Sequence, residues 1–103
     1  MTCFAPDLSP AHEAIVHSIL SAHLPPAARV WLFGSRARGP AKKFADLDLA
    51  IDAGRKLSLS KLIALTDAFV ESDLPYKVDV VDRRRIEPGF ARAIEADLVP
   101  LVA

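Results

Sequence analysis

The chain has 103 residues, of which 51% are hydrophobic and 25% are charged, and its 13 basic and 13 acidic side chains cancel. This length predicts a single domain over residues 1–103, and the balanced charge gives no overall electrostatic attraction to nucleic acid. No apolar run approaches the roughly 20 residues of a membrane span, and we expect no signal peptide. Cys3 is the only cysteine, which excludes an internal disulfide and a cysteine-based zinc site. We therefore expect a cytoplasmic protein.

The first predicted element is a helix that begins at Ser9-Pro10, because serine is a common N-cap and proline is favoured in the first turn. Leu24-Pro25-Pro26 ends it, since proline cannot continue a helix. Three histidines lie in or near this helix, but His12 and His17 are five residues apart and do not share a face. We interpret them as solvated or partly packed side chains rather than metal ligands. The predicted core-facing stripe consists of Ile15, Ile19, Leu20 and His23.

Residues 29–33 form the first predicted strand, with Trp31 as a core residue, and this strand ends at Gly34-Ser35, a turn of small side chains. A short helix over residues 35–38 follows. The basic loop after it carries Lys42 and Lys43, which we interpret as solvated charges, with a partner or nucleic-acid surface as the alternative.

The second predicted strand, residues 47–51, alternates apolar and polar side chains. Side chains two residues apart on a strand lie on the same face. Asp46 and Asp48 therefore project from one face, toward a cleft. The opposite, buried face carries Leu47, Leu49 and Ile51.

A second long helix is predicted from Ser58 or Ser60 to about Glu71, and Leu74-Pro75 ends that segment. The third strand is predicted over residues 76–81, with Lys77, Asp79 and Val81 on one face. The second helix has apolar side chains at the spacing of a core-facing stripe, namely Leu59, Leu62, Ile63, Thr66, Phe69 and Val70.

Pro88 is predicted to begin a last helix that Pro100 ends, with Phe90, Ile94 and Leu98 on one face. Before it, residues 83–85 are three arginines in a polar loop, interpreted in the same way as the earlier basic loop. The predicted order is helix, strand, short helix, strand, helix, strand, helix. This alternation predicts an α/β (α+β) fold, a small mixed β-sheet with helices packed on it.

Several apolar side chains fall outside these stripes, and the hydrophobic fraction is high for a small chain. Both features indicate a partly apolar surface that binds another protein. The segment after Pro100 cannot continue the last helix, so we expect it to dock on a partner or on the edge of the sheet. The side chains outside the stripes are Val16, Leu65, Val99, Leu101 and Val102.

The acidic pair on the second strand is the strongest chemical signal. Two carboxylates on one rigid face repel each other and remain ionised most readily with a cation between them. A hard divalent ion such as Mg²⁺ suits oxygen ligands and leaves coordination positions for phosphate oxygens. Asp79, an acidic residue inside a predicted buried strand, supplies a third carboxylate, whose alternative interpretation is a structural pair with Lys77 or an arginine.

Gly34-Ser35, followed after ten residues by Asp46-Leu47-Asp48, resembles the GSx₁₀DxD signature of the DNA polymerase beta-like nucleotidyltransferases. The small size resembles the minimal nucleotidyltransferase group, whose fold is similar to the polymerase beta palm. The family often has serine immediately before the first aspartate, whereas this chain has Ala45. The signature covers about a fifth of the chain, and the order of the flanking elements fits it.

This resemblance implies roles for specific residues. Asp46 and Asp48 would bind two Mg²⁺ ions, and Asp79 would bind one ion and help to deprotonate the attacking hydroxyl. Gly34 and Ser35 would hold the β- and γ-phosphates of a nucleoside triphosphate. Two further residues, Arg36 and Arg38, could pair with the same phosphate oxygens, with solvated loop charges as the alternative.

We expect a nucleotide pocket in this short chain but no domain to hold a second substrate, which points to an acceptor on another protein. Minimal nucleotidyltransferases pair with HEPN-type toxins, so the resemblance implies an antitoxin that transfers AMP from ATP to a toxin tyrosine. The alternative is a nucleotide-binding module that neutralises its partner by contact alone. We expect a hetero-oligomer, or a homodimer when the chain is alone, without membrane association or direct nucleic-acid binding. The pattern does not distinguish ATP from other nucleotides.

Overall fold

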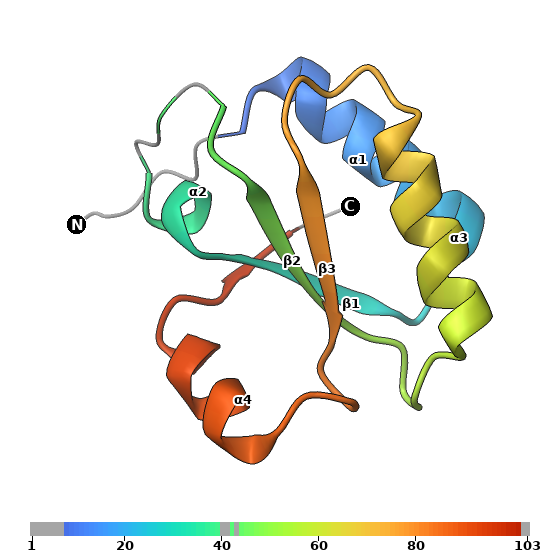
Figure 1. Cartoon of the computed structure of the whole chain (residues 1–103), viewed down its shortest axis with the longest axis vertical. Coiled ribbons are helices and arrows are strands. Elements are labelled where there is room, and N and C mark those ends of the chain that lie inside the picture. The colour runs from blue at the N-terminus through green and yellow to red at the C-terminus, as the bar shows by residue number, and fades with distance from the viewer. Residues whose placement is uncertain (1–7, 40–41, 43, 102–103) are drawn as a thin grey trace.

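The computed structural model describes residues 8–39, 42 and 44–101 (Figure 1). Cys3 and Lys43 therefore lie outside the described residues. The seven predicted elements occur in the predicted order, and one short strand is added after them. The elements are α1 (Pro10–His23), β1 (Arg29–Phe33), α2 (Ser35–Arg38), β2 (Leu47–Asp52), α3 (Leu59–Val70), β3 (Val78–Asp82), α4 (Pro88–Glu95) and β4 (Val99–Pro100).

The four strands form one sheet in the order β3-β2-β1-β4. β1 is antiparallel to β2 and β4, whereas β2 and β3 are parallel and are joined through α3. Figure 1 shows α1 and α3 side by side on one face of the sheet and α4 on the opposite side. The prediction of a small mixed sheet with packed helices is confirmed.

Serine side chains fix the starts of the two long helices. The hydroxyl oxygen of Ser9 accepts a hydrogen bond from the N–H of His12 at 3.2 Å, and Ser58 accepts one from the N–H of Lys61 at 3.1 Å. Each bond satisfies a first-turn donor that has no partner within its helix. None of the described helices combines the length and hydropathy that a membrane-crossing segment needs.

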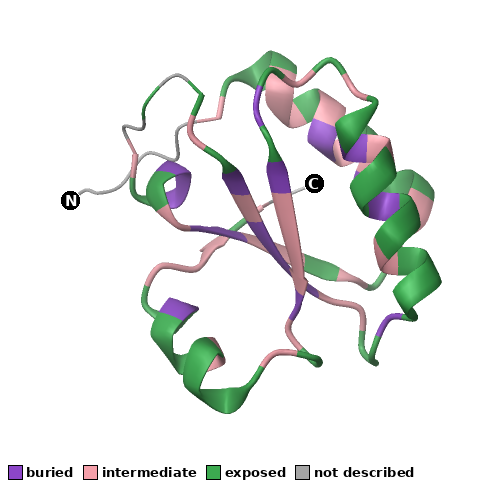
Figure 2. Cartoon of the chain, in the orientation of Figure 1, coloured by how far each residue is buried: buried purple, intermediate pink, exposed green. Residues whose placement is uncertain are grey.

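The core beneath α1 and α3 differs from the predicted stripes. Leu47, Leu49 and Ile51 of β2 are fully buried there, as the alternation predicts. Val16 and Leu65 are also fully buried, so their exclusion from the core-facing stripes was wrong. The other error concerns the opposite side of α3, which is exposed in Figure 2 and carries Leu59, Ile63, Thr66 and Val70.

The C-terminal part of the chain also differs from the prediction. α4 ends at Glu95 instead of continuing to Pro100, and Val99–Pro100 pairs with β1. The N–H of Leu101 donates to the carbonyl oxygen of Val30 at 2.9 Å, so this residue docks on the sheet edge, one of the two predicted alternatives. Val102 lies outside the described residues. β3 begins at Val78, two residues later than predicted.

Candidate active site

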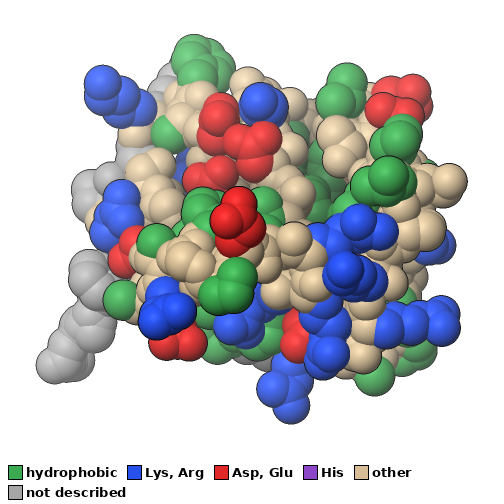
Figure 3. Space-filling view, turned by 60° about the horizontal axis from the view of Figure 1, so that its bottom comes forward, with side chains coloured by type: hydrophobic (Ala, Val, Ile, Leu, Met, Phe, Trp, Pro, Cys, Tyr) green, Lys and Arg blue, Asp and Glu red, His purple; other side chains and the backbone are tan. Residues whose placement is uncertain are grey.

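The sheet register brings two of the predicted carboxylates together. Asp48 lies opposite Phe33 across the β1–β2 pair and opposite Asp79 across the β2–β3 pair. Residues at paired positions have side chains on the same face of a sheet. Asp46 lies two residues before Asp48, at the exposed entrance to β2. Figure 3 shows acidic side chains gathered in one region of this side of the molecule, apart from the main group of basic ones.

The Gly34 turn lies directly against Asp48. Gly34 has a φ of 77°, in the left-handed region that favours glycine. A Cβ atom built at this position would collide with the Oδ2 atom of Asp48. Any larger residue would therefore displace this carboxylate or the turn. The structure thus joins the two halves of the sequence signature in space.

The carboxyl group of Asp48 has an unusual proton affinity. Its pKa is raised from 3.8 to about 6, first because burial disfavours the charged form, and then because the Asp79 and Asp46 carboxylates lie nearby. Lys77 opposes this shift. A group of carboxylates that holds a proton near neutral pH is one that a divalent cation would stabilise in the ionised form.

Asp79 has a basic partner, Lys77. The Nζ atom of Lys77 lies 3.4 Å from its Oδ1 atom, and both side chains are well exposed to solvent. The Lys77 pair named in the alternative interpretation of Asp79 is therefore present, although an exposed pair of this kind is weak. The role of Asp79 in the site stays a prediction. In the part of the chain that the structure describes, no three acidic, histidine or cysteine side chains already converge to surround an ion. An ion bound here would require the carboxylates to turn toward it.

Arg36 lies inside the protein. Its guanidinium group stacks 3.9 Å from the centre of the Tyr76 ring, and its Nε–H donates to the carbonyl oxygen of Ala45 at 2.9 Å. The Tyr76 hydroxyl lies 3.0 Å from Nδ1 of His12. Arg36 thus connects α2 to the backbone immediately before Asp46, a positioning role. Its predicted contact with phosphate stays a prediction.

Arg38 has a different environment from its neighbour two residues earlier. Its side chain is about half exposed, and its Nη1 atom donates to Oδ2 of Asp97 at 2.8 Å, just after α4. An exposed ion pair can open at low cost. Arg38 therefore remains the more accessible of the two arginines for the predicted phosphate contact.

Sequence reasoning missed an aromatic pair beside the carboxylates. The Phe33 and Phe90 rings meet edge to face with their centres 6.3 Å apart, and Phe33 shares its face of the sheet with Asp48. Phe90 is 44% exposed. The pattern of the last helix already included Phe90, but only the packing of α4 on the sheet brings its ring against Phe33.

Sequence reasoning also missed the structural role of the acidic residues that end β2 and β3, Asp52 and Asp82. Asp82 is almost fully buried and accepts hydrogen bonds from the N–H groups of Leu57 at 2.7 Å and Arg84 at 2.9 Å. Asp52 accepts from the Nε–H of Arg84 at 2.7 Å, which holds the pKa of Asp52 below its usual value. The Nε–H of Arg85 also donates to the Leu57 carbonyl oxygen at 2.7 Å. Arg84 and Arg85 are therefore not simply solvated.

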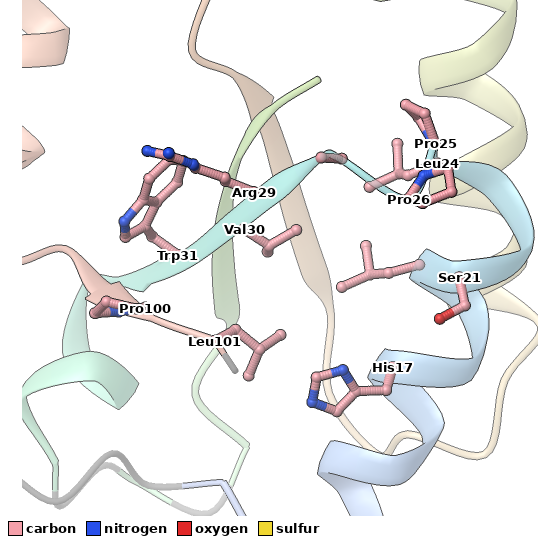
Figure 4. A pocket seen from close by; sticks show the side chains of 12 residues that line it. His17, Ser21, Leu24, Pro25, Pro26, Arg29, Val30, Trp31, Pro100 and Leu101 are labelled. Atoms are coloured by element: carbon pink, nitrogen blue, oxygen red, sulfur yellow. The ribbon is translucent and has the colours of Figure 1, made fainter. Parts of the chain in front are cut away.

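A cavity of about 580 Å³ lies elsewhere, between α1 and the β1–β4 edge of the sheet (Figure 4). Its walls are mainly apolar and include Leu24, Val30 and Leu101, with His17 and Arg29 as the ionisable lining residues. None of the three site carboxylates lines it. It is therefore separate from the candidate active site.

Comparison with known proteins identifies the family. The family model described as "Polymerase beta, Nucleotidyltransferase" matches residues 16–102, which include the Gly-Ser turn and all three aspartates. The chain belongs to the polymerase beta nucleotidyltransferase family. It is therefore an enzyme of the nucleotidyltransferase class, and its minimal size and sheet agree with the resemblance in the sequence.

Individual relatives indicate which kind of nucleotidyltransferase the chain resembles. It is 48% identical over 95 residues to the probable protein adenylyltransferase MntA of Haemophilus influenzae, which covers 91% of this chain and 82% of the relative. It is 31% identical to the protein adenylyltransferase MntA of Thermococcus cleftensis, covering 82% and 90% of the two chains. The fold matches a crystal structure of a toxin–antitoxin with AMP-PNP, with a TM-score of 0.74, 24% identity and coverage of 88% and 73%.

Proposed function

We propose that this nucleotidyltransferase transfers AMP from ATP to a tyrosine of a partner HEPN-type toxin and acts as the antitoxin. The observation that carries the proposal is the placement of Asp48 between the Gly34 turn and Asp79, with its pKa raised to about 6. The similarity to MntA protein adenylyltransferases supports a protein acceptor, and the AMP-PNP in the similar toxin–antitoxin structure supports ATP as donor.

The donor set fits Mg²⁺ by its chemistry, since the carboxylates of Asp79 and Asp46 help to raise the pKa of Asp48, and a cation among the three would relieve this repulsion. Asp46, Asp48 and Asp79 would hold one or two ions. A bound Mg²⁺ would neutralise charge on the triphosphate and on the departing pyrophosphate. Gly34 and Ser35 would position the phosphates, with Arg38 available from its ion pair with Asp97.

In the proposed transfer, the phenolic oxygen of the tyrosine forms a bond to the α-phosphorus of ATP. The bond between that phosphorus and the oxygen bridging to the β-phosphate breaks, and pyrophosphate leaves with the electron pair. Asp79 accepts the phenolic proton, because its exposed carboxylate can separate from Lys77 without breaking a buried contact.

The second candidate is neutralisation by contact, without transfer. It is favoured by one observation, that no three potential ligands among the described residues already surround a metal position. A binding module would not need them to do so. The two candidates make opposite predictions for a chain that folds and binds but has a damaged site.

The test is Asp48→Asn, measured by incorporation of labelled AMP into the partner toxin and by growth during co-expression. We expect transfer to fall by at least about 100-fold, as for loss of a group that stabilises the transition state, and growth to be poor. The matched control is Glu95→Gln, an exposed acidic residue outside the site. Normal growth with Asp48→Asn and no transfer would support contact alone, and full transfer would refute the site.

A ligand experiment separates binding from chemistry. Mg²⁺ with ATP should raise the thermal stability of the native chain, by about 2.7 kcal/mol at a ligand concentration 100 times the dissociation constant. The increase should be smaller in Asp48→Asn and unchanged in Glu95→Gln. Equal increases in all three chains would show that the nucleotide binds without these carboxylates.

A further inference from the structure

The outer side of α3 carries an apolar stripe that the fold leaves uncovered. Leu59, Ile63 and Val70 are 63%, 60% and 75% exposed, and Thr66 lies between them on the same line of the helix. The core-facing side of this helix is already formed by other residues, among them the fully buried Leu65. The stripe therefore contributes nothing to the core of a single chain, and its exposure disfavours an isolated molecule in water.

The charges around α3 have the order that an isolated helix disfavours. Arg55 and Lys56 precede its N-terminus, whereas Asp67 lies in its last turn and Glu71 caps its C-terminus, all exposed. The partial positive charge of a helix N-terminus favours acidic residues, and the partial negative charge of its C-terminus favours basic ones. α3 has no acidic residue in its first turn and no basic residue in its last. Stability of the helix alone does not explain this order.

We propose that this side of α3 binds the same side of α3 in a second copy of the chain, in an antiparallel arrangement about a two-fold axis. The four stripe residues are spaced symmetrically about the middle of the helix. Antiparallel pairing therefore places Leu59 near Val70 of the partner subunit and brings the central residues of both stripes together. A two-fold axis creates every contact twice.

The same arrangement pairs the charges. The basic end of one helix, at Arg55 and Lys56, lies beside the acidic end of the other, at Glu71 of the partner subunit. Parallel packing would instead place like charges together. A partner of another sequence would have to supply both an apolar surface that fits the stripe and charges that match its two ends. A second copy supplies both by symmetry. This self-complementarity is the reason to assign the surface to a second copy.

The size of the surface predicts a weak complex. α3 has 12 residues and is therefore about 18 Å long. One pair of helices of that length buries less than the roughly 1,200–2,000 Å² that stable interfaces bury. We therefore expect a dimer that forms at high protein concentration and dissociates on dilution. Its charged ends should make it weaker at high salt.

The first experiment measures self-association of the full chain by analytical ultracentrifugation over a range of protein and salt concentrations. Ile63→Ser should weaken the dimer at least about tenfold, because it removes the central apolar side chain from both copies. Ala64→Ser is the matched control, since this exposed neighbour lies off the stripe. A chain that stays monomeric at all concentrations, or a dimer unaffected by Ile63→Ser, would overturn the proposal.

The second experiment tests the antiparallel orientation through its charges. Lys56→Glu and Glu71→Lys should each weaken the dimer, and the double variant should restore it, because the exchanged charges again face each other. Arg92→Glu, an exposed charge change on α4, should have no effect. Failure of the double variant to recover would overturn the orientation. Loss of toxin binding in Ile63→Ser with unchanged self-association would assign the stripe to the toxin instead. These outcomes do not depend on transfer activity.

Discussion

The two faces of β2 have different roles, although alternate residues of a single six-residue strand supply both. Leu47, Leu49 and Ile51 point into the core under α1 and α3 and are fully buried. Asp48 points to the other side, next to Asp79 and the Gly34 turn, and its pKa is raised to about 6. The core face stabilises the fold, whereas the acidic face costs stability for as long as the carboxylates are ionised and without a cation.

This contrast shows how a very small enzyme can hold mutually repelling carboxylates close together. The packed side chains of one face fix the strand, and that strand in turn fixes the carboxylates on the other face. A substitution on the core face should therefore lower the free energy of unfolding, whereas substitution of Asp48 should raise it. Of four predictions, ordered from the largest expected effect, the first and last test this difference, and the two between them compare a buried charged side chain with an exposed one.

The largest loss is expected on the core face. Leu49→Ala should lower the free energy of unfolding by about 2–5 kcal/mol, because it leaves a cavity in a fully buried cluster. Chemical denaturation measures the change. Asp79→Asn on the opposite face is the control and should change stability little. A loss below about 1 kcal/mol for Leu49→Ala would mean that this face is not the main source of stability.

The next effect concerns the carboxylate at the end of β3. Asp82→Ala should cost about 1–3 kcal/mol, because it leaves the buried N–H group of Leu57 without its acceptor. Asp52→Ala, which removes a more exposed partner of Arg84, should cost less than about 1 kcal/mol. Denaturation curves of the two variants give the comparison. Equal losses would contradict the distinction between a buried and an exposed acidic group.

The two arginines after the Gly-Ser turn should differ in a similar way. Arg36→Ala should cost about 1–2 kcal/mol, since it removes the stack on Tyr76 and the donor to the Ala45 carbonyl oxygen. Arg38→Ala should cost less than about 0.5 kcal/mol, because its pair with Asp97 is exposed. Thermal unfolding with nucleotide absent measures both. A larger loss for Arg38→Ala would reverse our assignment of the positioning role.

The smallest effect should have the opposite sign. The pKa of Asp48 is higher in the folded chain than its ordinary 3.8, so the folded state holds the proton more tightly. The native chain should therefore lose stability as pH rises from about 4 to about 6, and Asp48→Asn should lack this loss. At pH 7 the variant should be more stable by about 1 kcal/mol after allowance for solvent screening, and at pH 3 the difference should vanish. Thermal unfolding against pH, without divalent ions, would contradict this if the variant were less stable at pH 7.

Local patterns in the sequence predicted much of the fold. The serine caps before α1 and α3 and the alternation in β2 depend on residues a few positions apart, and each was confirmed. The Gly-Ser turn and the aspartates were also recognisable, because the spacing of the signature reflects one turn and one strand. These features are set by chain geometry within one element, so the sequence contains what is needed to infer them.

Other features were decided only when distant segments packed together. α3 has apolar residues on two sides, and the sequence cannot tell which side meets the sheet, since hydrophobicity serves a core and an interface equally. Leu65 was accordingly misplaced. The interior position of Arg36 depends on Tyr76, 40 residues later in the chain. The register that places Asp79 opposite Asp48 likewise arises from pairing of separate strands, because a residue's own neighbours carry no information about what will cover it.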